Sequence, residues 1–235
     1  MQFILYYWKS QFYTPLIKDI ILIVTLWIAF KNRGKFPILK FMPIYTFALL
    51  LASLVFLGAW IARDLSFYPE LFFGLASYID YLFTLVEMVI FSHFYYQLIK
   101  SRLVKRIILF ANGLFIGFFV YMAITDQGRY SYISEEKQTV VYTIESLILL
   151  FPCICYVIEL FKKQPTSTLK NQPEFWVSTG VLFFMACTLP YSLLENYITK
   201  NFDDVILASY SIFHVFYILL FLMIIRAYLC KPKIE

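Results

Sequence analysis

Apolar stretches of membrane-spanning length alternate with short polar loops along almost the whole of the 235-residue chain. A helix needs about 20 mostly apolar residues to cross the hydrocarbon layer of a bilayer. The pattern predicts an all-α polytopic membrane protein, a single domain over residues 1–235 with seven transmembrane helices. The seven stretches are residues 12–30, 43–61, 72–98, 107–124, 139–161, 175–194 and 205–228.

The first of these stretches is the weakest, because only Ile20–Phe30 is free of charged residues. The preceding residues complete the length if the side chain of Lys18 extends along its own stem toward the lipid headgroups. We therefore expect a full span with Lys18 reaching outward. An interfacial helix remains the alternative for this segment.

Hydrophobic residues make up 61% of the chain and charged residues 15%, whereas soluble domains have roughly 25% charged residues. A soluble fold of this length needs a polar shell that this composition does not provide. The composition therefore excludes a soluble protein. The aromatic share of 21% is more than interfacial belts use, so we expect Phe and Tyr to pack between helices too.

The distribution of Lys and Arg among the loops predicts the orientation in the membrane. It places the N-terminus outside and the C-terminus in the cytoplasm, with the protein in a bacterial inner membrane. The net charge of +5 is then an orientation signal, with membrane lipids as partners, and we expect no nucleic acid partner. Of the 20 basic residues, 14 lie on the predicted cytoplasmic side: Lys31, Arg33, Lys35, Lys40, Lys100, Arg102, Lys105, Arg106, Lys162, Lys163, Lys170, Arg226, Lys231 and Lys233.

Two features of the predicted helices concern their packing. Gly113 and Gly117 form a Gly-x-x-x-Gly step, which lets the backbone of another helix approach closely. The neighbour is either a helix of the same chain or one of a second copy in a homo-oligomer. Pro152 and Pro190 lie inside predicted spans, where each removes a backbone hydrogen bond and is expected to kink its helix.

Acidic and hydroxyl side chains stand at helical spacing inside four of the predicted spans. The i, i+4, i+7 spacing of Asp80, Thr84 and Glu87 puts them on one face of a helix. At 1.5 Å per residue, Glu87 and His214 fall deepest below the outer surface, and the polar positions at about 10 Å are Asp80, Glu145, Thr188 and Ser192. We expect a ligand-binding site in the outer half, formed by Asp80, Thr84, Glu87, Glu145, Thr188, Ser192, Glu195, Tyr210 and His214.

Burying acids in a membrane needs a physical reason, because three of them cost on the order of 8 to 10 kcal/mol. In one interpretation, the acids and His214 satisfy one another as interhelical glue. In the other, they line a water-accessible pocket that opens outward and binds a small polar or cationic ligand. Apolar surroundings disfavour the charged form of a carboxyl, so we expect Glu87 to be protonated at pH 7.

Catalytic and cofactor motifs are missing from the sequence. His93 and His214 lie on different faces and at different depths, which is too little for a zinc hydrolase. The last span has no Lys for retinal, and there is neither a phosphate-binding loop nor a Gly-x-Ser-x-Gly turn. We expect no enzymatic activity, no metal and no cofactor. Cys230 stands where a juxtamembrane cysteine can be palmitoylated.

The later part of the chain carries a resemblance. The segments are Glu145–Leu147, Pro152, Glu159–Lys163, Pro173–Trp176 and Tyr228–Lys231. With them, the chain resembles small seven-helix membrane proteins of the Bacteroidota, which are similar to the membrane sensor regions of histidine kinases. The resemblance covers the last three or four spans and implies a signal-input role by analogy of fold. The sequence ends seven residues after Tyr228 without a kinase domain, so we expect signalling through a cytoplasmic partner.

These patterns together predict a membrane sensor or receptor-like protein that binds a ligand from outside and signals inward. A proton- or cation-coupled secondary transporter of small solutes is the alternative, with the same acids as coupling groups. A non-catalytic structural subunit of a membrane complex is the second alternative, in which the acids only hold helices together.

Overall fold

A computed structural model describes residues 2–32, 34–64, 69–125, 135–163, 169–201 and 203–230. The described residues form helices and connecting turns without a β-strand, so the predicted all-α class is confirmed. Each of the seven predicted ranges lies within one long helix. The elements are α1 Gln2–Lys31, the short 3-10 helix η1 Pro37–Leu39, α2 Met42–Asp64, α3 Pro69–Leu98, α4 Arg102–Thr125, α5 Glu135–Lys163, α7 Pro173–Asn201 and α8 Asp203–Tyr228.

Several of these helices are long and apolar enough to cross a bilayer. Within the described residues, four segments meet that condition, and Ile212–Tyr228 in α8 is a shorter apolar helix. The chain therefore has the general character of a membrane-embedded protein. The four segments are Pro37–Gly58, Arg102–Met122, Thr139–Lys162 and Pro173–Leu194.

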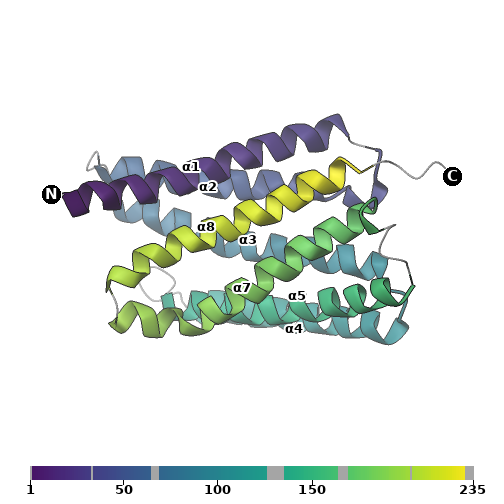
Figure 1. Cartoon of the computed structure of the whole chain (residues 1–235). Helices are drawn as coiled ribbons and strands as arrows, with labels where there is room; N and C mark the ends of the chain where they lie inside the picture. The colour runs from purple at the N-terminus through teal and green to yellow at the C-terminus, as the bar shows by residue number, and fades with distance from the viewer. Residues whose placement is uncertain are drawn as a thin grey trace.

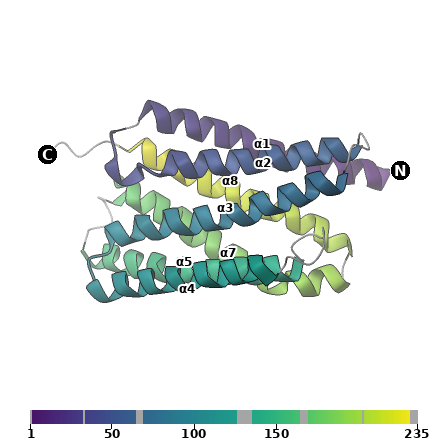
Figure 2. The same cartoon turned by 180° about the vertical axis from the view of Figure 1, so that it is seen from behind.

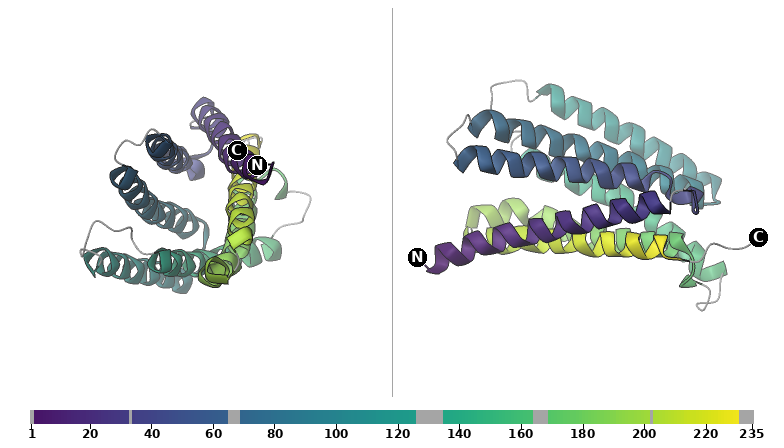
Figure 3. Two further views of the ribbon diagram at one scale, coloured as in Figure 1. Left: turned by 90° about the vertical axis from the view of Figure 1, so that its left-hand side faces the viewer. Right: turned by 90° about the horizontal axis from the view of Figure 1, so that it is seen from above.

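The helices lie side by side in a bundle (Figure 1), and the contacts between neighbouring helices form a closed ring. Around the ring, α1 packs on α2, α2 on α3, α3 on α5, α5 on α7, α7 on α8, and α8 returns to α1. Helix α4 lies outside this ring against α5 and α3, as the end-on view in Figure 3 shows. The ring thus directs one face of six different helices toward a common interior.

The direction of each helix decides which residues share a level. Helix α1 begins at one end of the bundle and α8 ends at the other, and the two run in the same direction (Figures 1 and 2). The most extensive contact joins α7 and α8. It includes Gly180, where an added Cβ would stand 3.0 Å from Cβ of Met223 and 3.1 Å from Cδ1 of Leu220. A glycine is required here because the two helices approach closely.

One expectation about an individual residue is corrected, and the surroundings of three others are now known. The side chain of Lys18 is only 7% exposed, so it points into the bundle and does not reach outward to headgroups. Cys230 is buried as well, which makes its thiol a poor palmitoylation target. Gly113 and Gly117 have no described atom within 4 Å of an added Cβ, so the close approach of a helix of the same chain is not found.

The two glycine environments give a matched test of the helix packing. We predict that Gly180→Leu destabilises the protein by about 1–3 kcal/mol, because the larger side chain must displace α8. Gly113→Leu, the control, extends into open space and should leave the melting temperature unchanged. Thermal unfolding in detergent measures both. Equal melting temperatures for the two variants would contradict the α7–α8 packing.

Candidate functional site

Two buried carboxyl groups inside the ring act electrostatically on one buried tyrosine. Glu87 of α3 and Glu145 of α5 are 3% and 5% exposed, and Tyr45 of α2 is fully buried. Both carboxyls interact electrostatically with the phenol of Tyr45, and Glu87 has the larger effect of the two. Three separate helices therefore bury polar groups inside the ring. The assignment of the two acids to a ligand site stays a prediction. Tyr45 was not predicted as a member of the site.

Aromatic rings surround Tyr45 and fix its position. Its ring stacks on Phe83 of α3 and on Phe221 of α8, with 5.6 Å between centroids in each pair. Phe91, two turns after Phe83, meets it edge-on at 4.9 Å. These contacts join α2, α3 and α8, so a movement of Tyr45 would also displace the side chain of α8 that stacks on it.

The hydroxyl groups that the sequence placed near the acids are also buried. Thr84 is 2% exposed, and Thr188 and Ser192 are each 3% exposed. Thr188 lies between Phe184 and Tyr191 on α7, whose rings contact α8: Phe184 lies 4.5 Å from Tyr217, and Tyr191 lies 5.9 Å from Phe213. Thr188 therefore faces α8 beside His214.

Two buried polar atoms of this α7–α8 contact have no hydrogen bond. Among the described residues, neither Oγ1 of Thr188 nor Nδ1 of His214 finds a hydrogen-bonding partner. A buried polar group left in this state costs about 1–3 kcal/mol. Because buried polar groups are otherwise almost always satisfied, these two atoms are positions where an ordered water or another small molecule can complete the hydrogen bonding.

The structure adds Lys18 of α1 to the site, whereas the sequence predicted that its side chain extends toward the lipid headgroups. Its Nζ lies 3.8 Å from Oδ1 of Asp19, and the same oxygen accepts a 2.6 Å hydrogen bond from Ser53 of α2. The charge of Lys18 also acts on the ring of His214 in α8. An adjacent Lys–Asp pair inside an apolar stretch was the available signal, since a lysine directed to headgroups does not need a neighbouring acid.

Cross-helix contacts give the relative height of these groups. Tyr45 packs between Phe83 and Phe91 and is thus level with Glu87. Phe221 is at the same level, so His214, seven residues earlier, stands about 10 Å nearer the end where α8 begins. Asp19, the neighbour of Lys18, bonds to Ser53 of α2, which stands eight residues and about 12 Å from Tyr45 toward the same end, so Lys18 is at nearly the level of His214.

The levels of Glu145 and Thr188 follow from the contacts of α5 and α7. The thiol of Cys153 in α5 contacts the carbonyl oxygen of Ser178 in α7 at 3.4 Å. Because α5 and α7 run in opposite directions, Glu145 is then level with residues 186–188 of α7. Thr188 is level with His214, because the α7 rings on either side of it contact Phe213 and Tyr217. The outer level therefore holds Lys18, His214, Thr188 and Glu145, and the inner level holds Glu87 and Tyr45. We call these six residues the interior polar layer.

Some predicted site residues lie outside what the structure describes. The side chains of Asp80, Glu195 and Tyr210 are not among the described ones, so their membership of the site stays a prediction. His93 was left out of the site on the basis of its helix face. It is exposed, with Nε2 2.7 Å from Nε2 of Gln97.

Comparison with protein-family models finds no match to this chain, and comparisons with curated proteins and with solved structures find none either. The interpretation of the interior polar layer therefore depends on its own residues: two carboxyls, an ammonium, an imidazole and two hydroxyls contributed by six helices.

Thr188 tests whether the unsatisfied hydroxyl is structural. We predict that Thr188→Val leaves the stability of the ligand-free protein unchanged or raises it by up to about 1 kcal/mol, because a costly buried hydroxyl is removed. The control is Thr25→Val, since the buried Thr25 hydroxyl donates a 2.7 Å hydrogen bond to the carbonyl oxygen of Ile21. Thermal unfolding compares them. A clear loss of stability in Thr188→Val would show that the hydroxyl is already satisfied.

Proposed function

We propose that this protein is a seven-span membrane sensor that binds a small polar or cationic ligand in the interior polar layer and signals to a cytoplasmic partner. The observation that carries the proposal is that Glu87 and Glu145, on different helices, are both buried and both act electrostatically on the buried phenol of Tyr45. Interhelical glue needs one acid and one donor. Two acids beside unsatisfied polar atoms are better explained by a ligand.

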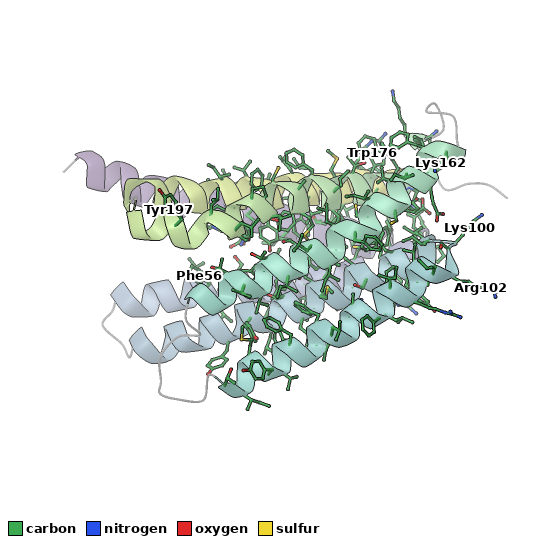
Figure 4. The ribbon with its side chains drawn as sticks, turned by 90° about the horizontal axis from the view of Figure 1, so that it is seen from below. Phe56, Lys100, Arg102, Lys162, Trp176 and Tyr197 are labelled. Atoms are coloured by element: carbon green, nitrogen blue, oxygen red, sulfur yellow. The ribbon has the colours of Figure 1, made fainter. Side chains whose placement is uncertain are left out.

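The proposed orientation is supported by the charge at the two ends of the bundle. Lys100, Arg102 and Lys162 stand at one end, and Tyr197 at the other (Figure 4). The described acidic residues at the basic end are Glu159 and Glu174. Clustered Lys and Arg mark the cytoplasmic side of a bacterial inner membrane. The exposed basic side chains of that end are Lys31, Lys35, Lys40, Lys100, Arg102, Arg106, Lys162, Lys170 and Arg226.

Aromatic side chains accompany these basic residues, as at a membrane interface. Nζ of Lys31 lies 5.1 Å from the ring centroid of Trp27, and the guanidinium of Arg226 lies 5.3 Å from that of Trp176. Such pairs hold the charge at headgroup depth while the ring stays at the edge of the hydrocarbon. They support seven crossings, with the basic end in the cytoplasm.

Cysteine labelling tests this orientation directly. In a background with the four native cysteines replaced by alanine, we predict that Tyr197→Cys reacts with a membrane-impermeant maleimide on intact cells. Arg102→Cys should react only after the cells are opened, because it lies at the cytoplasmic end. Both side chains are exposed in the structure, so accessibility is matched. The reverse labelling pattern would contradict the proposed topology.

The inner half of the bundle favours a sensor over a transporter. On the cytoplasmic side of Glu87, the interior holds buried aromatic side chains, including Phe91, Phe94 and Tyr95. A transporter must open its site to the cytoplasm in turn, and packed rings oppose such a path. A sensor needs only a mechanical connection through this region.

Helix α8 provides such a connection. Phe221 touches Tyr45 at the level of the acids, and Tyr228, two turns later, donates a 3.2 Å hydrogen bond to the carbonyl oxygen of Leu39 in η1. Arg226 covers Trp176 at the same end. A ligand that moves Tyr45 would therefore shift the contacts of α8 at the cytoplasmic surface, where a partner docks.

A proton-coupled transporter is the second candidate. It is favoured by the series of titratable groups from Lys18 through His214 and Glu145 to Glu87, which extends over about 10 Å along the bundle. Proteoliposomes distinguish the two candidates. Proton or solute flux that is lost in Glu87→Gln would establish the transporter, and its absence in a ligand-responsive protein agrees with the sensor.

Native mass spectrometry tests ligand binding itself. We predict that the protein purified in mild detergent carries a small molecule. The doubly substituted Glu87→Gln/Glu145→Gln protein should lose it, because its carboxyl charge is gone. Glu159→Gln, which changes a partly exposed acid near the cytoplasmic end of α5, is the matched control and should retain the ligand. Identical spectra for all three proteins would refute a role of the interior acids in binding.

A further inference from the structure

An imidazole lies on the outer surface of α3, near the basic end of the bundle. His93 is exposed and stands five residues, about 7.5 Å, before α3 ends at Leu98. Val89 and Leu82, which precede it by one and three turns on the same helix face, are 48% and 54% exposed. His93 therefore ends an apolar stripe that suits hydrocarbon. A polar group at this depth needs a partner, because hydrocarbon offers no hydrogen bond.

One of the two ring nitrogens of His93 is satisfied within α3. Its Nε2 lies 2.7 Å from Nε2 of Gln97, one turn later. An amide nitrogen only donates hydrogen bonds, so the imidazole accepts at Nε2 and carries its hydrogen at Nδ1. Among the described residues, none forms a hydrogen bond with Nδ1. An N–H donor is thus left at the outer surface, where an acceptor from the membrane reaches it.

Two ammonium groups lie near this donor, each placed over a ring that adjoins His93. The ring of Phe41 meets the imidazole edge-on, with 5.0 Å between centroids, and Nζ of Lys40 lies 5.8 Å from the Phe41 centroid. Tyr96 follows His93 by three residues, and Nζ of Lys105 lies 4.8 Å from its ring centroid. Helices α2 and α4 thus each bring an aromatic-bound cation to the outer surface of α3.

These cations are not neutralised by acids of the protein. Within the described part of the chain, neither Lys40 nor Lys105 forms an ion pair. The described acids of the basic end, Glu159 and Glu174, both act on Tyr156 of α5, whereas α2 packs on α1 and α3. The outer surface of α3 at this end therefore carries an excess of positive charge, which attracts anionic headgroups.

We propose that the phosphate of an anionic phospholipid binds at Nδ1 of His93, beside the ammonium groups of Lys40 and Lys105. Its acyl chains then lie along the apolar stripe of α3. A phosphate accepts charge-assisted hydrogen bonds from ammonium groups and a further bond from the imidazole N–H. The apolar stripe favours a lipid over a soluble phosphate compound, since only a lipid fills both parts of the surface. The site lies outside the ring and is separate from the interior polar layer.

Native mass spectrometry of the purified full-length protein tests the site. The probes are phosphatidylglycerol and phosphatidylcholine with identical acyl chains, added in mild detergent at equal concentration. We expect about fivefold greater retention of phosphatidylglycerol, which is the effect of roughly one Lys beside an anionic headgroup. Equal retention of the two lipids would overturn the inference. Retention of inorganic phosphate to the same extent as phosphatidylglycerol would also overturn it, because the acyl chains would then contribute nothing.

Substitutions identify the residues that bind the headgroup. His93→Leu and Lys40→Gln should each reduce the preference for phosphatidylglycerol to less than about twofold. Lys31→Gln is the matched control, because Nζ of the exposed Lys31 also lies over a ring, 5.1 Å from the centroid of Trp27. It belongs to α1, which packs on α2 and α8, so its loss should leave the preference unchanged.

The same variants separate a specific site from a general effect of charge. All three replaced side chains are exposed, so the melting temperatures should equal that of the wild type. If His93→Leu does not fold, Lys105→Gln serves instead and should show the same loss of preference. An equal loss in Lys31→Gln would show nonspecific attraction and overturn the site. An unchanged preference in Lys40→Gln would overturn it as well.

Discussion

The structure depends on one constraint: a polar group inside a bilayer must be satisfied by the protein itself, because hydrocarbon offers no partner. Each buried acid therefore has to face the bundle interior. The ring of α1, α2, α3, α5, α7 and α8 meets this constraint by directing one polar face of each helix inward. Tyr45, held by Phe83 and Phe221, is where three of these faces meet.

The same constraint explains the contrast between α4 and the other helices. Helix α4 lies outside the ring, where its exposed side chains such as Phe110 and Leu114 are apolar and suit lipid. Its polar residue Asn112 bonds to the carbonyl oxygen of Ile108 in its own helix, at 2.7 Å. Asn112 is thus satisfied within its own helix, and the interior polar layer draws nothing from α4.

Sequence periodicity predicted the helices and the inward direction of Glu87 and Glu145, because hydropathy and the cost of buried charge are local properties. It could not predict Tyr45, since one tyrosine among 19 has no special signal before the helices are placed. The direction of Lys18 was predicted wrongly, because outward extension is the usual solution and only the contacts with α2 and α8 reverse it. Within the chain the close approach occurs at Gly180, where Met223 faces it, and a contact at Gly113 stays a prediction for a second copy.

The central claim is that the carboxyl of Glu87 and the hydroxyl of Tyr45 interact inside the bundle. A double-mutant cycle of Tyr45→Phe and Glu87→Gln, followed by thermal unfolding in detergent, measures that interaction with least interference. The account predicts a coupling free energy of about 0.5 kcal/mol or more between the two positions. Additive effects, with a coupling indistinguishable from zero, would contradict it.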